Sequence, residues 1–176
     1  ILLSDEGDST THFSIIDQDG MAVANTYTLE QSYGSKIVVR GAGFLLNNEM
    51  GDFNTRPGVT DHRGRIGTPP NLIVPGKRML SSQAPTIVAR DGRVVLVTGS
   101  PGGRTIINTV LCVVLNALEF DMTPREAVAA PRLHHQWFPD EVKLEASAAP
   151  ISLATLEQLR ALGHAISQRD ADGRPW

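Results

Sequence analysis

A strand–turn–strand pattern near the start of the chain constrains its fold more than any other feature. Residues 11–16 and 21–29 are rich in β-prone side chains and flank Asp17-Gln18-Asp19-Gly20, a strong turn signal. The pattern predicts a β-hairpin. Such a hairpin places Thr10, at the start of the first strand, beside the end of the second strand, where Thr28 stands.

The same pattern occurs again further along the chain and is followed by helical spacing. Residues 85–89 and 94–98 flank Arg90-Asp91-Gly92-Arg93, so a second hairpin is expected. After it, the run Gly99-Ser100-Pro101-Gly102-Gly103 opens a helix, because apolar residues then recur three or four positions apart between 106 and 117. Hairpins followed by helices indicate an α+β layered fold.

Four other segments have weaker patterns. A short strand is expected over residues 36–40. Residues 54–76 are expected to form a loop, because they contain four prolines, four glycines and no apolar periodicity. Short helices are expected over residues 123–130, which begin with a capping box, and over residues 152–162, which are followed by a glycine.

Composition and charge exclude several classes of protein. A chain of 176 residues with 41% apolar and 20% charged residues has the size and balance of one globular domain. Its net charge of -3 and its scattered lysines and arginines argue against nucleic-acid binding. No apolar run is long enough to span a bilayer. The single Cys112 cannot form an internal disulfide, and no spacing of cysteines and histidines predicts a metal site.

Thr10 can act as a nucleophile only with a base to activate it. A threonine hydroxyl is a poor nucleophile until its proton is removed. Cleavage of the preceding peptide bond would free the α-amino group of Thr10, and an α-amine with a pKa of about 7.7–8.0 is suited to that task. Without this cleavage, Thr10 and Thr11 are simply good strand-forming residues.

Three further segments could contribute to a site. Gly102 and Gly103, at the mouth of a helix, could present backbone N–H groups to an oxyanion. The carboxylates of Glu49 and Asp52 could hold an ammonium ion, and the adjacent hydroxyls of Ser81-Ser82 could bind a carboxylate. Each segment is equally explained as an ordinary turn, so none identifies a function alone.

Together, these motifs resemble the small subunit of gamma-glutamyltranspeptidases in their order and spacing, from Thr10 to about His164. The segments that carry the resemblance are Thr10-Thr11-His12-Phe13-Ser14, Leu45-Leu46-Asn47-Asn48-Glu49-Met50 with Asp52-Phe53, Leu80-Ser81-Ser82 with Pro85-Thr86, Thr98-Gly99-Ser100-Pro101-Gly102-Gly103, and Ala130-Pro131-Arg132 with His134-His135-Gln136. The resemblance implies an N-terminal-nucleophile hydrolase with an αββα sandwich. Residues 10–176 would be its catalytic small-subunit domain, and residues 1–9 a linker from the large-subunit side of the precursor.

The resemblance also implies roles for the matching residues. Thr10 corresponds to the nucleophile that autocatalytic cleavage exposes, Thr28 to the threonine that orients it, and Gly102 and Gly103 to the oxyanion hole. The substrate-binding positions are Glu30, Glu49 and Asp52 at the α-amino group, with Ser81 and Ser82 at the α-carboxylate. The implied reaction cleaves glutathione and other γ-glutamyl amides through an ester on Thr10. Water or an amino-acid or dipeptide acceptor completes it, and it needs no metal or organic cofactor.

Several features depart from the family pattern. Glu30 stands where many members have asparagine, and Arg63 stands in the segment that matches the lid, where some members have an aromatic residue. The chain is expected to be C-terminally truncated, because a strand should follow its last turn signal. It is expected to pair with the large subunit of the same precursor, which would supply an arginine to the substrate. A periplasmic or extracellular location is an expectation from the resemblance alone.

Two alternatives to the γ-glutamyl reaction stay open at this point. A cephalosporin-acylase-like member would remove a glutaryl side chain, which lacks the α-amine. The γ-glutamyl reaction is favoured by the retention of Glu49, Asp52, Ser81 and Ser82, whereas Glu30 keeps the acylase alternative open. The second alternative is an uncleaved, non-catalytic homologue. The intact set of Thr10, Thr28 and Gly102-Gly103 argues against it, because a decayed site should have lost at least one of these residues.

Overall fold

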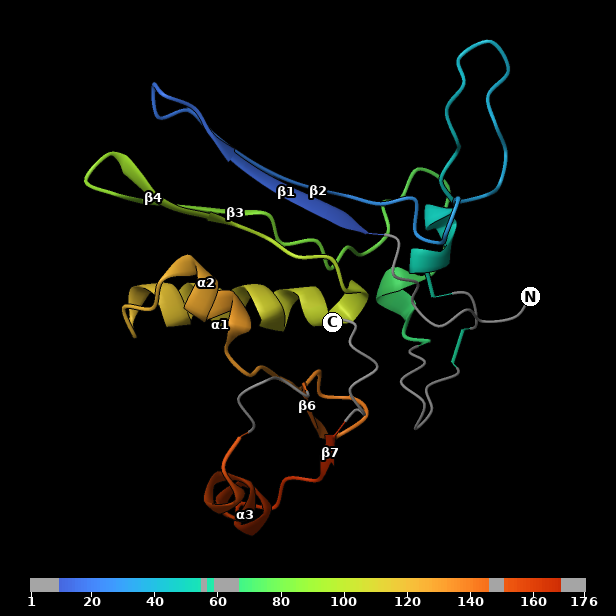
Figure 1. Ribbon diagram of the computed structural model, residues 1–176. Helices are drawn as coiled ribbons and strands as arrows, with labels where there is room; N and C mark the ends of the chain where they lie inside the picture. Colours follow the sequence, from blue (N-terminus) through green and yellow to red (C-terminus); the bar gives the residue numbers. More distant parts are fainter. Residues whose placement is uncertain (1–9, 55–56, 59–66, 146–150, 169–176) are drawn as a thin grey trace.

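Residues 10–54, 57–58, 67–145 and 151–168 are described in the structure, a computed structural model. The larger part consists of two β-hairpins and a long helix, which lie one above another in Figure 1. The smaller part, lower in the same view, combines a short helix with short strands. The predicted α+β class is therefore confirmed.

The first hairpin is formed by β1 (Thr11–Ile16) and β2 (Ala22–Tyr27), which pair antiparallel with Thr11 opposite Tyr27. The carboxylate of Asp17 closes the turn by accepting two backbone N–H hydrogen bonds of 2.9 Å. Such a turn is what the Asp-rich signal predicts. The hairpin is confirmed, although β2 ends two residues earlier than the expected strand.

The second hairpin is formed by β3 (Thr86–Arg90) and β4 (Arg93–Thr98). Asp91 and Gly92 have positive φ values of 51° and 75°, which fits the Asp-Gly turn. β4 contacts both strands of the first hairpin and also the long helix. It therefore occupies the middle of the stack.

The long helix α1 (Ile106–Leu118) follows a 3-10 turn, η3 (Gly103–Thr105). It therefore begins slightly later than the glycine run that predicted it. Its buried face comprises Ile106, Val110 and Val113. The next helix, α2 (Pro124–Ala129), has the predicted capping box, in which Thr123 and Glu126 exchange side-chain and backbone hydrogen bonds.

The smaller part has its own core. α3 (Leu153–Ala161), capped by Ser152 as predicted, packs against a sheet of β5 (Leu133–His134), β6 (Val142–Leu144) and β7 (Ile166–Gln168). Val142, Leu144 and Leu156 are buried between helix and sheet. The sequence did not predict these strands, because two or three residues are too few to show an alternating pattern.

One expectation about the irregular segments was wrong. The strand expected over residues 36–40 is absent, and only one antiparallel bridge, Val38 to Leu45, forms there. The backbone explains this, since Tyr33 and Lys36 adopt positive φ values of 66° and 61° and turn the chain repeatedly. The expected loop 54–76 is described only at residues 54, 57–58 and 67–76, where its regular elements are the 3-10 turn η2 (Pro69–Asn71) and a bridge from Asn54 to Leu72.

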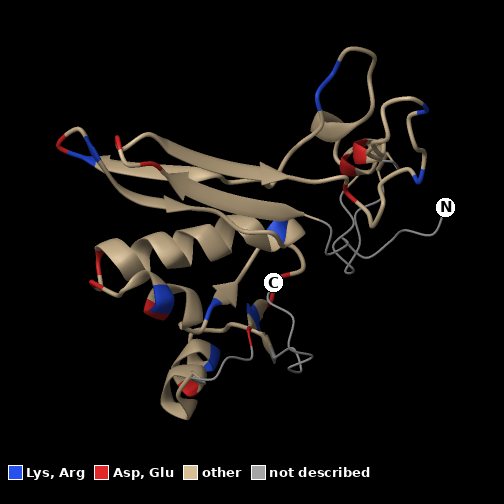
Figure 2. Ribbon diagram, turned by 45° about the horizontal axis from the view of Figure 1, so that its top comes forward, with Lys and Arg blue, Asp and Glu red and all other residues tan. Residues whose placement is uncertain are grey.

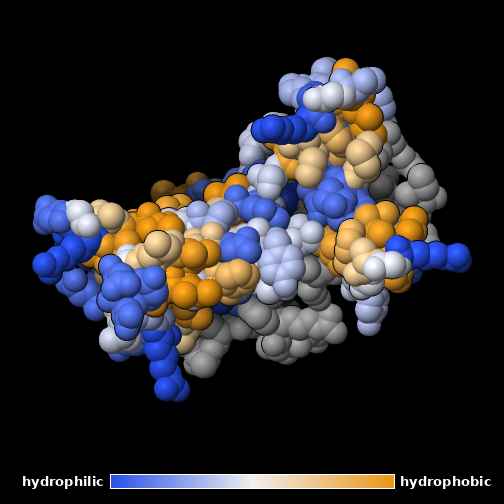
Figure 3. All heavy atoms as spheres, turned by 90° about the horizontal axis from the view of Figure 1, so that it is seen from above, coloured by the Kyte–Doolittle hydropathy of each residue, from blue (hydrophilic) through white to orange (hydrophobic). Residues whose placement is uncertain are grey.

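The upper face of the first hairpin is apolar and exposed. Phe13, Ile15, Val23 and Tyr27 alternate with inward-facing residues and keep 40–54% of their surface accessible. Figure 3, seen from above, shows hydrophobic side chains gathered over this hairpin. No helix among the described residues is long and apolar enough to cross a membrane.

Candidate active site

Most of the predicted site residues lie at one end of the stacked part. The open end of the first hairpin, the start of α1 and two 3-10 turns, η1 (Glu49–Asp52) and η2, gather there in Figure 1. These segments are far apart in the sequence. The topology therefore brings together pieces that the sequence motifs could only list separately.

Thr10 and Thr28 stand opposite each other at the open end of the hairpin. The last ladder pair is Thr11 with Tyr27, so the next pair in register is Thr10 with Thr28. Both side chains are half-buried. The hydroxyl of Thr28 accepts a hydrogen bond of 2.8 Å from the backbone N–H of Glu30, which fixes the turn that follows.

His12 lies on β1, two residues after Thr10, and therefore on the same face of the hairpin. It belongs to a motif of the family resemblance, but the sequence assigned it no role. Its Nδ1 lies 2.7 Å from the hydroxyl of the buried Thr26, and its Nε2 lies 2.9 Å from the hydroxyl of Ser14. The ring covers Gly99, where an added Cβ would lie 2.7 Å from Nε2. Burial lowers the pKa of the His12 imidazole and so favours its neutral form.

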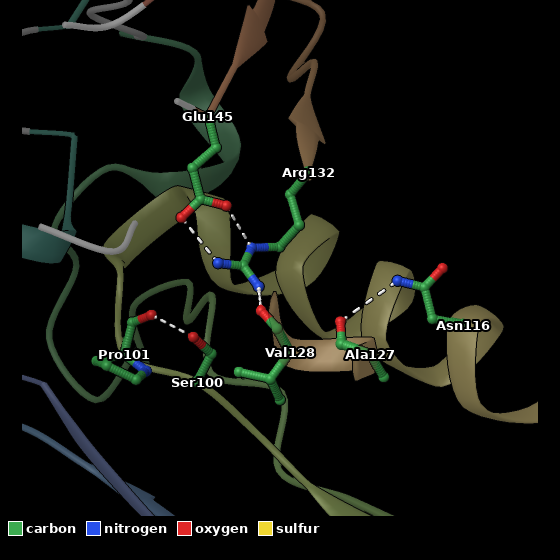
Figure 4. A network of polar contacts seen from close by, with 7 residues as sticks. All are labelled: Ser100, Pro101, Asn116, Ala127, Val128, Arg132 and Glu145. Atoms are coloured by element: carbon green, nitrogen blue, oxygen red, sulfur yellow. Dashed lines mark hydrogen bonds and ion pairs between the residues drawn. The ribbon is translucent and has the colours of Figure 1, made fainter. Parts of the chain in front are cut away.

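The glycine run forms a tight turn before α1. Gly102 and Gly103 adopt φ values of 131° and 55°, a region that side chains disfavour, which explains the requirement for glycine. The hydroxyl of Thr105 donates a hydrogen bond of 2.7 Å to the carbonyl of Gly102 and so stabilises the turn. The buried Ser100 donates 2.6 Å to the carbonyl of Pro101 (Figure 4). Backbone N–H groups at such a helix entrance can stabilise an oxyanion.

Three carboxylates meet at η1. Glu30, at a φ of 72°, turns its side chain over Gly51, so that it lies beside Glu49 and Asp52. Burial, followed by the charge and hydrogen bond of Asp52 and the charge of Glu30, raises the pKa of Glu49 to about 7. Figure 2 shows η1 in red at this end of the molecule. A cluster whose negative charges repel one another is suited to a cationic group.

Asn71, which the sequence analysis missed, joins this cluster to the predicted serines. It is only 4% exposed. Its Nδ2 donates a hydrogen bond of 2.7 Å to the carbonyl of Asp52, and its Oδ1 accepts one of 3.0 Å from the backbone N–H of Leu80. Ser81 and Ser82 follow directly, the first exposed and the second half-buried. No pattern in the sequence could have found Asn71, since a buried asparagine inside a loop looks like any other turn residue.

Arg132, a part of the motif that had no assigned role, forms a polar network with Glu145 and Val128 in Figure 4. Its Nε and Nη2 each lie 2.7 Å from a carboxylate oxygen of Glu145, and its Nη1 donates 2.6 Å to the carbonyl of Val128. Both charged side chains are nearly buried. The network ties the end of α2 to β6 and is structural.

The paired histidines have structural contacts. The buried His134 lies 2.8 Å from the side-chain oxygen of Gln136, and His135 lies 3.1 Å from the carboxylate of Asp140. Across the described residues, no group of three histidine, cysteine or acidic side chains could hold a metal ion. Residues 1–9 and Arg63 lie outside the described residues.

The chain is similar to gamma-glutamyltranspeptidases over nearly its whole length. The profile of the Gamma-glutamyltranspeptidase family matches residues 3–174. The glutathione hydrolase proenzyme of Escherichia coli is 48% identical over 168 residues, which are 96% of this chain and 28% of that protein. That of Pseudomonas aeruginosa is 48% identical over 164 residues, or 93% and 29%. The chain therefore spans less than a third of the length of these relatives.

Solved structures agree with the sequence matches. A crystal structure of Helicobacter pylori gamma-glutamyltranspeptidase superposes with a TM-score of 0.80 at 46% identity, covering 90% of this chain and 84% of that chain. The Bacillus anthracis transpeptidase CapD, 24% identical, covers 92% of this chain and 79% of its own with a TM-score of 0.62, and shows the shared fold. These neighbours confirm the expected N-terminal-nucleophile hydrolase fold.

Proposed function

Because the chain belongs to the gamma-glutamyltranspeptidase family, we propose that it carries the catalytic nucleophile of a γ-glutamyl hydrolase and transferase. The observation that supports this most strongly is the meeting of Thr10, the glycine turn and the acidic cluster at one end of the fold. In this proposal residues 10–176 are the catalytic small-subunit domain, and residues 1–9 are the linker from which autocatalytic cleavage separates it.

The first chemical step forms an ester on Thr10. Its Oγ attacks the γ-carbonyl carbon of the substrate while its proton passes to the freed α-amino group. The oxyanion is stabilised by the N–H groups of Gly102 and Gly103. The carbon–nitrogen bond then breaks and the leaving amine takes up the proton. Thr28, opposite Thr10 in the hairpin register, orients the attacking hydroxyl.

The second step releases the acyl group. Water attacks the ester carbonyl and gives glutamate, or the amine of an amino acid or dipeptide attacks it and gives a new γ-glutamyl amide. In both cases the Thr10 oxygen recovers a proton as the ester bond breaks. Each bond made or broken involves only carbonyl, hydroxyl and amine groups, so the step needs no cofactor.

Recognition of the γ-glutamyl group rests on its amino-acid end. Glu30, Glu49 and Asp52 accept from the α-ammonium, and Ser81 with Ser82 donates to the α-carboxylate. The closeness of three carboxylates supports a γ-glutamyl over a glutaryl group, because the latter has no ammonium to neutralise them. Glu30, which kept the acylase alternative open in the sequence, lies within this cluster and thus supports the γ-glutamyl reaction.

The partner in this proposal is the large subunit of the same precursor. The relatives are more than three times as long as the matched segment. Two apolar surfaces are exposed: the upper face of the first hairpin, and a helical stripe of Ile107, Leu111 and Leu115 on α1. Exposed apolar area of this kind marks an interface. Burial against the remainder of the precursor would explain both surfaces.

The test uses the full-length protein that contains this chain, with Thr10→Ala in parallel. Intact mass reports cleavage, and γ-glutamyl-p-nitroanilide reports activity through release of p-nitroaniline. We expect a subunit that begins at Thr10, and release that disappears in the variant. Cleavage of the chain without release of p-nitroaniline would favour the glutaryl-acylase hypothesis. The absence of both would refute the enzymatic proposal and favour an uncleaved homologue.

A further inference from the structure

Asn71 links the two segments that, in the proposed function, bind opposite charges of the substrate. Its side chain lies between η1, which carries Glu49 and Asp52, and the irregular segment that carries Ser81 and Ser82. One amide thus donates to the carbonyl of Asp52 and accepts from the N–H of Leu80, the residue before the serines. Both hydrogen bonds have good lengths, 2.7 and 3.0 Å.

The position of Asn71 is itself fixed. Its backbone carbonyl accepts a hydrogen bond of 2.8 Å from the N–H of Asn54, and a parallel β-bridge joins Asn54 to Leu72. Lys77 adds a hydrogen bond of 3.3 Å to the carbonyl of Leu72. The amide is therefore a rigid, almost fully buried connector. Its loss would leave a backbone carbonyl and a backbone N–H without their partner.

We propose that Asn71 is a specificity-determining positioning residue, which holds the ammonium-binding and carboxylate-binding segments at the separation that one α-amino acid requires. The inference rests on the proposed function. The two charged groups of a γ-glutamyl substrate are attached to one carbon, so their separation is fixed. Both segments can engage together only if their own separation is equally fixed, because small misplacements are costly in a preorganised site.

This role differs from general support of the fold in a measurable way. A substrate that carries only one of the two charged groups needs only one segment, and the relative position of the segments does not matter to it. Three p-nitroanilides separate these cases: γ-glutamyl with both groups, glutaryl without the ammonium, and 4-aminobutyryl without the carboxylate. A loss confined to the first substrate identifies coupling between the segments.

The experiment compares wild type, Asn71→Ala and Asn71→Asp in the full-length protein. Asn71→Asp keeps the size of the side chain and the acceptor for Leu80 but removes the donor to Asp52. It therefore tests the same proposal if the alanine variant does not fold. For γ-glutamyl-p-nitroanilide we expect KM to rise about tenfold in either variant with kcat within about twofold, as lost ground-state binding requires. For both single-charge substrates we expect kcat/KM to change less than about twofold.

Asn116→Ala is the matched control. Asn116 also donates from its side chain to a backbone carbonyl, that of Ala127, 3.3 Å away on α2. It should lower thermal stability without changing the preference among the three substrates. The inference would be overturned if the Asn71 variants lost kcat/KM equally on all three substrates, or lost it on none of them. A wild type that hydrolyses none of them, or prefers glutaryl, would instead overturn the proposed function itself.

Discussion

The carboxylate of Glu30 lies directly over the backbone of Gly51. A Cβ at position 51 would lie 2.6 Å from Cδ and 2.7 Å from Oε2 of Glu30, closer than real side chains approach. The positive φ of Glu30, 72°, directs its side chain into this space. The absence of a side chain at position 51 thus allows a third carboxylate to join Glu49 and Asp52.

The first prediction follows from this contact. Gly51→Ala should displace the Glu30 carboxylate from the cluster and raise KM for γ-glutamyl-p-nitroanilide by roughly three- to tenfold, with kcat nearly unchanged. In a Glu30→Ala background the same change should cost less than about twofold, because nothing remains to displace. Steady-state kinetics of the four proteins form the measurement. Equal losses in both backgrounds would show that position 51 acts independently of Glu30.

The second prediction concerns pH and stability. The pKa of Glu49 is raised from its usual 4.5 to about 7 in the folded protein. Between these values the folded state binds more protons than the unfolded state, so the free energy of unfolding should fall as pH rises from about 4.5 to about 7. Glu49→Gln should remove this fall. The Tm of the variant minus that of wild type should therefore increase as pH rises across that interval.

The control for this measurement is Glu157→Gln, which removes an exposed carboxylate on α3, away from the cluster. The Tm of this variant is compared with wild type over the same interval, and the difference should vary less with pH than the difference for Glu49→Gln. The effect at Glu49 will be smaller than the full shift implies, since the group is only half-buried and solvent screens it. A constant difference between Glu49→Gln and wild type from pH 4.5 to 8 would contradict the prediction.

The sequence predicted those features that long patterns or strong turn signals specify. The first hairpin, whose ladder ends with Thr11 opposite Tyr27, followed from a six-residue strand and an Asp-Gly turn. The buried face of α1 followed from helical periodicity. β5, with two residues, was too short to detect.

Within the candidate site, the limit of prediction was tertiary contact. Glu30 was visible as a departure from the family pattern, yet its position over Gly51 depends on a positive φ that the residue type does not reveal. The bridging role of Asn71 depends on two partners, Asp52 and Leu80, at different distances along the chain. Such contacts leave no periodic signal, so the structure was needed to find them.

The third prediction concerns His12 and Gly99, which join the strand of the nucleophile to the turn that carries Gly102 and Gly103. Gly99→Ala would force the His12 ring from its place between Thr26 and Ser14. We expect kcat to fall tenfold or more, because a displacement of about 1 Å near reacting groups can cost that much. In a His12→Ala background, Gly99→Ala should cost less than about twofold.

Measurement of kcat, KM and Tm for the four proteins tests this coupling. The control for the loss of a histidine is His164→Asn. His164 is exposed and lies in the smaller part of the structure, so this variant should leave kcat unchanged. If Gly99→Ala were equally harmful with and without the ring, the glycine would be needed for the turn itself. His12 would then have no part in setting the position of that turn.

The fourth prediction concerns the ion pair of Arg132 and Glu145, whose side chains are only 12% and 11% exposed. Arg132→Ala leaves a nearly buried carboxylate without its cation and should lower the free energy of unfolding by about 3–5 kcal/mol. Replacing both partners, as Arg132→Met with Glu145→Leu, should cost less because no charge is stranded. On β6, which Glu145 follows, Lys143→Ala breaks the more exposed pair with Glu141 and should cost less than about 1 kcal/mol. Denaturant unfolding of the four proteins distinguishes these costs, and a double variant as unstable as Arg132→Ala would show that packing rather than charge sets the loss.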